Sequence, residues 1–203
     1  MFFSEPDDNL VQKQDLVAFD FETATYKMDS ACALGVAVIS PTGEIKDQKY
    51  WLIKPPKNKY YSKNIQIHGI TPEQTQDAKT FAELWEQIRP YFEKQNIIAH
   101  YALFDVNVLY ACIKAAGQQL PELGDIYCSC ISARRSLPHL TNHKLPTVCA
   151  DLQIPLLHHH NALDDVIACA MIAHKLKNHS LAKLTFQQAK SQSLYQKEFF
   201  KKL

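Results

Sequence analysis

Apolar residues gather in short runs along the chain, and the first of these runs predicts a buried strand at 16–22. Apart from Asp20, residues 16–21 are apolar at odd and even positions alike, which is typical of a central strand covered on both faces. Similar runs, bounded by turn residues, predict four more strands at 34–39, 49–53, 97–99 and 126–131.

Helical periodicity follows the first three strands. Thr80 precedes a run with apolar residues at helical spacing, so we expect it to cap a helix there. The same periodicity predicts a helix that contains Asp105 and stops near Gly117, a short helix at 147–152 and a long helix at 162–176. Three meandering strands are followed by helix-linked strands, an order that indicates an α/β protein.

Two acidic residues, Asp20 and Glu22, stand one residue apart at the end of the first predicted strand. Because side chains alternate along a strand, both carboxylates are expected on the same face. Two buried like charges are unfavourable unless protons or metal ions neutralise them, and grouped carboxylate oxygens suit Mg²⁺ or Mn²⁺. The alternative is an edge strand with solvated acids, against which the apolar flank argues.

Further acids stand where other elements begin. Asp105 and Asp165 are each expected in the first turn of a helix. Asn161 and Asp164 have the spacing of an N-cap and N3 pair, so Asp164 has a capping role, whereas the pattern gives Asp165 none. Acids at one strand and two helix starts therefore predict a shared metal site.

Three segments in this order carry a resemblance to a known family. Residues 19–23 hold the acid-any-acid pair, residues 99–105 follow the pattern Ala-His-any-Ala-any-Phe-Asp, and His160 stands five residues before Asp165. They resemble the three motifs of the DEDDh 3′→5′ exonucleases, the proofreading epsilon-subunit-like family, over about residues 16–176. The sister class has Tyr four residues before the last acid, where this chain has Asn161.

The resemblance implies a ribonuclease H-like fold, with a mixed five-stranded sheet flanked by helices, at 16–178. An N-terminal extension would occupy 1–15 and a C-terminal tail 179–203. The implied cofactors are two Mg²⁺ or Mn²⁺ ions, roughly 3.5 to 4 Å apart. The implied catalytic residues are His160 as general base and the four metal ligands Asp20, Glu22, Asp105 and Asp165. The implied substrate contacts are Phe21, Thr23, His68, Ile70, Phe104 and His160.

Several alternatives stay open. The single-stranded DNA 3′ end is the favoured substrate, RNA or short oligoribonucleotides are the alternative, and a non-catalytic polymerase-accessory module is the other class. The complete set of acids favours an enzyme, because a pure binder gains nothing from an anionic pocket facing phosphates. Phe104 suits a base-stacking position and a core position equally well. Tyr101 replaces an Asn of many relatives, which leaves the metal ligands intact but alters the nucleotide pocket.

Three polar segments carry weaker predictions. The lysine-rich stretch at 54–63, which includes Tyr60 and Tyr61, suits either a phosphate-steering surface or a solvated loop. For His158 and His159 no role is predicted, because adjacent side chains are expected to diverge. Residues 196–200 resemble the peptides with which bacterial replication proteins bind the sliding clamp; the alternative is a tail that packs on the domain.

Composition adds few constraints. The chain has 203 residues, 46% of them hydrophobic, and a formal net charge of +1, so any nucleic-acid affinity must come from local patches. The first residues do not resemble a secretory signal and no apolar stretch is long enough to span a bilayer, so a cytoplasmic protein without a membrane partner is expected. Its six Cys residues are expected to be reduced.

Overall fold

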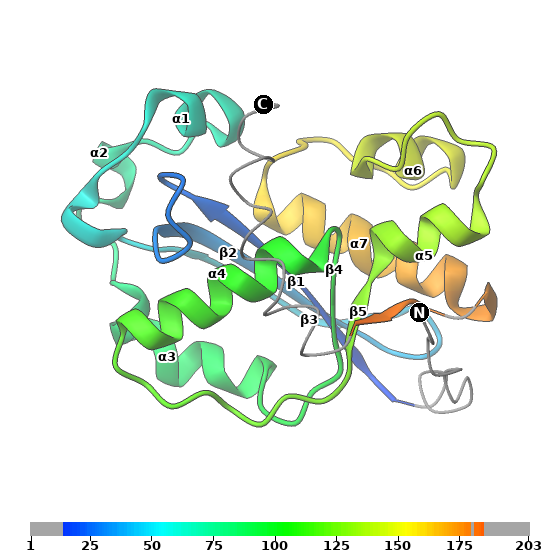
Figure 1. Ribbon diagram of the computed structural model, residues 1–203, viewed down its shortest axis with the longest axis horizontal. Coiled ribbons are helices and arrows are strands. Elements are labelled where there is room, and N and C mark those ends of the chain that lie inside the picture. The colour runs from blue at the N-terminus through cyan, green and yellow to red at the C-terminus, as the bar shows by residue number, and fades with distance from the viewer. Residues whose placement is uncertain (1–13, 180, 185–203) are drawn as a thin grey trace.

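The computed structural model describes residues 14–179 and 181–184, which form a mixed sheet with helices on both faces (Figure 1). The strand order is β3-β2-β1-β4-β5-β6. β1 pairs antiparallel with β2 and parallel with β4, and β5 pairs parallel with β4. The strands are β1 (Leu16–Thr23), β2 (Ala31–Ile39), β3 (Ile45–Leu52), β4 (Ile97–Ala99), β5 (Ile126–Cys128) and β6 (Lys183–Leu184).

Helices α3 and α4 pack on one face of the sheet, and α7, with α5 and α6 beside it, packs on the other (Figure 1). The shorter α1 and α2 lie beyond the end of the sheet, next to the loop that follows β1 (Figure 1). The helices are α1 (Ser62–His68), α2 (Pro72–Thr75), α3 (Phe81–Ile88), α4 (Ala102–Ala115), α5 (Ser129–Ser136), α6 (Leu145–Asp151) and α7 (Ala162–Leu176).

The central position predicted for the first strand is confirmed. β1 lies between β2 and β4, and only Asp20 along it is more than marginally exposed. Val17 and Phe19 enter the core beneath α3 and α4, whereas Leu16 and Ala18 enter the core beneath α7. The alternative of an edge strand with solvated acids is therefore wrong.

The start of α7 rests directly on β2. A Cβ atom added to Gly35 would lie 2.3 Å from the carbonyl oxygen of Ala162, so no side chain fits between this strand and the helix. Gly35 pairs with Asp20 across the β1–β2 ladder. This close approach brings the first turn of α7 beside the acidic end of β1.

Several predicted bounds differ from the structure. The helix predicted at 162–176 is confirmed at both ends, but the sheet has six strands rather than five because β6 adds antiparallel to β5. Leu181 and Ala182 are buried as well, so the packed domain extends past the predicted boundary at 178. The strand expected at 126–131 ends at Cys128, where α5 begins, and α1 was not predicted.

The six cysteines are all buried and free of disulfide bonds, as expected. Within the described ranges, no helix combines the length and the apolar character needed to cross a lipid bilayer. The predicted peptide at 196–200 lies outside the described residues.

Candidate active site

Three carboxylates meet at the end of β1. Asp20 and Glu22 project from the same face of the strand, and Asp165 comes from the first turn of α7. Oxygen atoms of the three side chains all lie within 4.8 Å of one another. Burial, together with repulsion from neighbouring carboxylates, raises the pKa of both Asp20 and Glu22 well above the usual carboxyl range. The site is therefore strongly unfavourable for charge unless a cation is bound.

Asp105 lies beside this group without belonging to it. It sits in the first turn of α4, as predicted, and its Oδ1 accepts a hydrogen bond of 3.0 Å from the backbone N–H of Phe21. Because Phe21 stands between Asp20 and Glu22, this bond attaches α4 to the acidic pair. Burial raises the pKa of Asp105 to about 8, although the bond from Phe21 opposes the rise.

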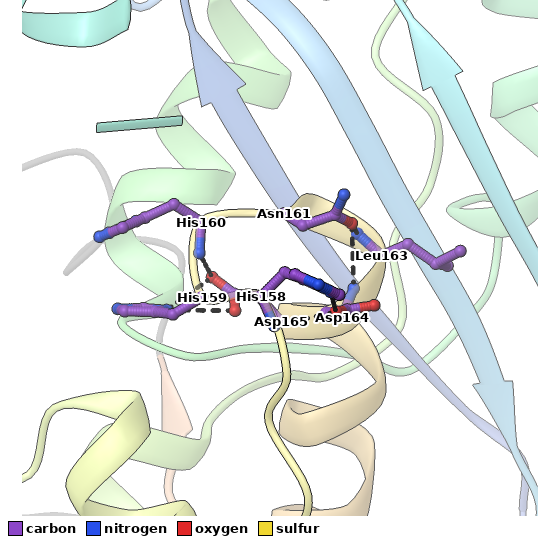
Figure 2. Close-up of polar contacts among 7 residues, drawn as sticks. All are labelled: His158, His159, His160, Asn161, Leu163, Asp164 and Asp165. Atoms are coloured by element: carbon purple, nitrogen blue, oxygen red, sulfur yellow. Dashed lines mark hydrogen bonds and ion pairs between the residues drawn. The ribbon is translucent and has the colours of Figure 1, made fainter. Parts of the chain in front are cut away.

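The first turn of α7 is held by a cap that the sequence predicted. The side chain of Asn161 accepts hydrogen bonds from the backbone N–H groups of Leu163 and Asp164, at 3.1 and 3.3 Å (Figure 2). Asp164 in turn accepts from the backbone N–H of His158 at 3.1 Å. Asp164 therefore has a structural role, which leaves Asp165 to face the acids of β1.

Of the three consecutive histidines, His158 turns toward Asp164, with its Nδ1 2.9 Å from Asp164 Oδ2, but His159 and His160 do not diverge as expected. His160 has a left-handed backbone, with φ of +71°, and its ring stacks on that of His159 with centroids 3.8 Å apart. Figure 2 shows the two rings side by side, both extending away from α7. The prediction failed because alternation of neighbouring side chains holds for extended backbone and not for a left-handed residue.

Asp165 has more partners than its sequence position indicated. Its Oδ2 accepts a hydrogen bond of 3.0 Å from the backbone N–H of His160, and His159 Nδ1 lies 3.1 Å from each carboxylate oxygen (Figure 2). The expectation that Asp165 lacks a structural role is therefore wrong. His159, to which no role was assigned, contacts a predicted metal ligand, directly before the left-handed residue His160.

His160, the predicted base, is half-buried at the rim of the carboxylate group. Burial and the neighbouring His159 lower its pKa, whereas Asp165 opposes the change. A lowered pKa keeps the ring neutral near pH 7, and a neutral imidazole can accept a proton.

Two of the predicted substrate contacts, His68 and Ile70, are engaged within the fold. His68 Nδ1 accepts from the backbone N–H of Ile70 at 3.0 Å, so its Nε2 carries the hydrogen that faces the carbonyl oxygen of Thr23 at 3.2 Å. The same carbonyl accepts from Asn64 Nδ2 at 2.8 Å. Ile70 is only 8% exposed and packs near Cys32. These contacts fix the loop that ends α1 against the end of β1.

The two predicted phenylalanines differ in position. Phe21 is buried in the core beside Phe19, so contact with substrate is open to its backbone and not to its ring. Phe104 is half-buried against the same core. Tyr101, just before α4, is 39% exposed and has a left-handed backbone with φ of +70°. An exposed, strained aromatic residue therefore stands one helical turn from Asp105.

The donor set fits a hard divalent cation. Asp20, Glu22 and Asp165 offer oxygen atoms at one point, and within the described ranges His159 is the one side chain that forms an ion pair with any of them. No lysine or arginine of those ranges neutralises the group. Grouped carboxylates without a fixed counter-charge are the ligand chemistry of Mg²⁺ and Mn²⁺.

Comparisons with known proteins agree with this chemistry. A family model described as Exonuclease (RNase_T) matches residues 17–173, which is well over half of the chain. The chain belongs to this exonuclease family. This confirms the resemblance predicted from the motifs and identifies the protein as a nuclease of the hydrolase class.

Sections of much longer proteins are similar to this exonuclease. DNA polymerase III PolC-type from Thermotoga maritima is 29% identical over 171 residues, covering 82% of the chain and 12% of the relative. The protein of the same description from Clostridium perfringens is 30% identical over 160 residues, covering 78% and 11%. The chain thus spans about an eighth of the length of these curated relatives.

Solved structures show the same fold. The nuclease domain of 3′hExo, described as a DEDDh family member bound to rAMP, has a TM-score of 0.71 at 18% identity, covering 84% of this chain and 96% of that one. Exonuclease X in complex with 5′ overhanging duplex DNA has a TM-score of 0.65 at 22% identity, covering 81% and 92%. The ribonuclease H-like architecture expected from the sequence is thereby confirmed, with six strands.

Proposed function

We propose that this exonuclease removes nucleoside monophosphates from the 3′ ends of single-stranded DNA in a reaction that requires divalent metal. The observation that carries the proposal is the carboxylate group of Asp20, Glu22 and Asp165 at the end of β1, with His160 at its rim. An anionic pocket repels a phosphodiester unless cations are bound there, so the arrangement suits a metal-dependent phosphodiesterase and not a simple binding module.

The proposed ligands are Asp20, Glu22 and Asp165, joined by Asp105, for two Mg²⁺ or Mn²⁺ ions. Bound ions would neutralise the carboxylates and polarise the scissile phosphate. Asp105 is oriented by the hydrogen bond that its Oδ1 accepts from the Phe21 amide. His160 accepts the proton of the attacking water on an imidazole nitrogen, and its half-buried position keeps that ring neutral.

The preference for DNA rests on the PolC-type relatives, whose matching sections belong to proteins described as DNA polymerases. A 3′→5′ exoribonuclease that trims RNA or short oligoribonucleotides is the second candidate. The observation that favours it is the similarity to a nuclease domain described as bound to rAMP. A non-catalytic module that retains the fold is the third, and the complete set of acids weighs against it.

The test is digestion of matched, end-labelled single-stranded DNA, duplex DNA and RNA with Mg²⁺ or Mn²⁺. We expect a descending ladder from the 3′ end, strongest on single-stranded DNA and absent with chelator. Asp165→Asn should abolish it, whereas Asp164→Asn, the neighbouring acid that serves the helix cap, is the matched control and should retain turnover. A ladder on RNA alone would select the exoribonuclease. Full turnover of Asp165→Asn would overturn the assignment of the site.

The C-terminal tail supplies a separate proposal about partners. Its peptide at 196–200 resembles clamp-binding sequences, and we propose that it recruits the enzyme to a sliding clamp or polymerase assembly. The tail has no part in the proposed chemistry, because every predicted catalytic residue lies between Asp20 and Asp165.

A further inference from the structure

Two exposed tyrosines from separate segments form a pair next to the residues that follow β1. Tyr26 lies in the loop after β1 and Tyr61 lies directly before α1, and they are 43% and 36% exposed. Their ring centroids are 5.2 Å apart with the planes inclined by 63°. Figure 1 shows α1 beside the loop that follows β1, which is where the two segments meet. An exposed aromatic pair offers ring faces on which nucleobases can stack.

The pair is attached to the strand that carries the catalytic acids. The backbone N–H of Tyr61 donates to the carbonyl oxygen of Ala24 at 2.9 Å, and Asn64 of α1 donates to that of Thr23 at 2.8 Å. Ser30 closes the loop around Tyr26, since its hydroxyl accepts from the backbone N–H of Thr25 at 3.1 Å. The pair is thus attached to the residues at the end of β1, and Tyr26 itself follows Glu22 by four residues.

The positive charge of the neighbouring segment is available to a ligand. Lys59 Nζ lies 5.4 Å from the centre of the Tyr61 ring, and Lys27, Lys57 and Lys63 are exposed nearby in sequence. Within the part of the chain that the structure describes, none of these lysines forms an ion pair with a carboxylate. The segment 54–68 itself contains neither Asp nor Glu. The charges of these exposed lysines are therefore not neutralised by a carboxylate and can meet phosphates.

The structure also separates the two consecutive tyrosines of this stretch. Tyr60 turns inward and its hydroxyl lies 2.8 Å from Thr75 Oγ1, and Lys54 Nζ donates to the carbonyl oxygen of Gln76 at 2.7 Å. These two residues support the fold. Lys59 and Tyr61 are exposed, as Tyr26 is. The lysine-rich stretch at 54–63 is therefore only partly a solvated loop.

We propose that Tyr26, Lys59 and Tyr61, here called the tyrosine surface, bind the unpaired strand on the 5′ side of the terminal nucleotide. Bases stack on the tyrosine rings and Lys59 contacts the backbone, the combination that single-strand binders use. Base faces are open to stacking only in an unpaired strand, so the tyrosine surface selects single-stranded substrates of sufficient length. The inference rests on the proposed nuclease function and specifies how its substrate is held.

The test compares Tyr26→Ala/Tyr61→Ala with Tyr26→Phe/Tyr61→Phe, which keeps both rings. Anisotropy titrations of labelled oligothymidylates of two and sixteen nucleotides measure the dissociation constant, and matched digestions measure kcat and KM. We expect the alanine variant to weaken binding and raise KM for the longer strand by about 5- to 150-fold per lost stacking contact. For the alanine variant on the dinucleotide, the dissociation constant and KM should match those of the wild type. For the phenylalanine variant they should match on both oligonucleotides. Lys175→Ala removes an exposed lysine of α7 and is the control for the loss of a surface charge elsewhere on the protein.

The titration separates this inference from the proposed function. A wild-type protein that binds the longer strand without cleaving anything would overturn the nuclease proposal alone. Equal dissociation constants for the wild type and the alanine variant on sixteen nucleotides would overturn the tyrosine surface, as would an equal loss on the dinucleotide. If the alanine variant fails to fold, Lys59→Glu tests the same surface, because charge reversal there should weaken binding of the longer strand at low salt and not at high salt.

Discussion

Gly35 of β2 and Ala162 of α7 meet backbone to backbone, with space for no atom between them. A Cβ at Gly35 would lie 2.3 Å from the Ala162 carbonyl oxygen, so the helix can only accommodate a side chain by moving away. Asp165 lies three residues further along α7 and must face Asp20 on β1. The geometry of the carboxylate group therefore depends on a glycine that contributes no side chain to it.

Gly35→Ala should reduce both stability and turnover. Overpacking at this contact is expected to cost about 1–3 kcal/mol of unfolding free energy, and a displacement of Asp165 by about 1 Å can slow chemistry by about 10²-fold. Thermal melts and single-turnover rates measure the two effects. Gly117→Ala is the control: it strains a left-handed position after α4, but its Cβ meets no atom within 4 Å, so activity should persist. A fully active Gly35→Ala would show that α7 tolerates the shift.

Asp105→Asn and Asp105→Ala should differ in stability while both abolish turnover. The Asn side chain retains an oxygen that accepts from the Phe21 N–H, whereas Ala leaves that buried donor unpaired, at about 1–3 kcal/mol. Chemical denaturation at fixed pH, in chelator, compares the two variants. Equal stabilities would mean that the Phe21 hydrogen bond contributes nothing.

The metal-free protein should lose stability as pH rises. Burial raises the folded-state pKa of Asp20, Glu22 and Asp105, so the folded protein binds more protons than the unfolded chain. The loss begins near pH 4, the ordinary carboxyl value, and for Asp105 continues to about 8. Melting temperatures recorded in chelator across this pH range measure the loss of stability. Asp105→Asn should show a shallower decline, and Mg²⁺ should reverse the loss in the wild type by binding the folded state.

His160→Ala should slow single-turnover chemistry by about 10²- to 10⁴-fold, because the proton acceptor is removed. In the wild type the rate should fall on the acidic side, since a protonated ring cannot accept a proton. His159→Ala is the matched variant: His159 helps to lower the pKa of His160, so its removal should shift the acidic limb to higher pH. Wild-type rates for His160→Ala from pH 6 to 8 would make His160 a structural residue.

Phe199→Ala/Phe200→Ala should abolish binding to a sliding clamp and leave digestion of short oligonucleotides unchanged. Adjacent aromatic residues of a short peptide commonly supply most of its binding energy. Titration of the full-length protein with the purified clamp gives the dissociation constant. An undetectable interaction for the wild type, or a lowered melting temperature for the variant, would favour the alternative that the tail packs on the domain.

The elements that the sequence predicted well are those with a strong local signal. β1 is apolar on both faces, and α7 combines a side-chain cap at Asn161 with unbroken periodicity, so both were predicted closely. α1 was missed because its N-cap, Tyr61, makes no side-chain cap, and α5 because it begins immediately after a strand. β6 consists of two residues and exists only because β5 offers it a free edge.

The features of the candidate site also differ in how well the sequence predicts them. The acids could be predicted because an acidic pair on a buried strand has few chemical explanations. The bond from Phe21 to Asp105 could not, because it joins a backbone group to a side chain 84 residues away. The contact of His159 with Asp165 comes directly before the left-handed residue His160, whose conformation no residue type in that position signals.

β6 gives the sheet a mechanical property. β6 lies at one edge of the sheet, while the predicted metal ligands of β1 lie three strands inward. A pull applied at β6 is carried first by the hydrogen bonds between β6 and β5, and within the sheet it reaches β1 through β4. β6 can therefore separate from the sheet without breaking any hydrogen bond of β1.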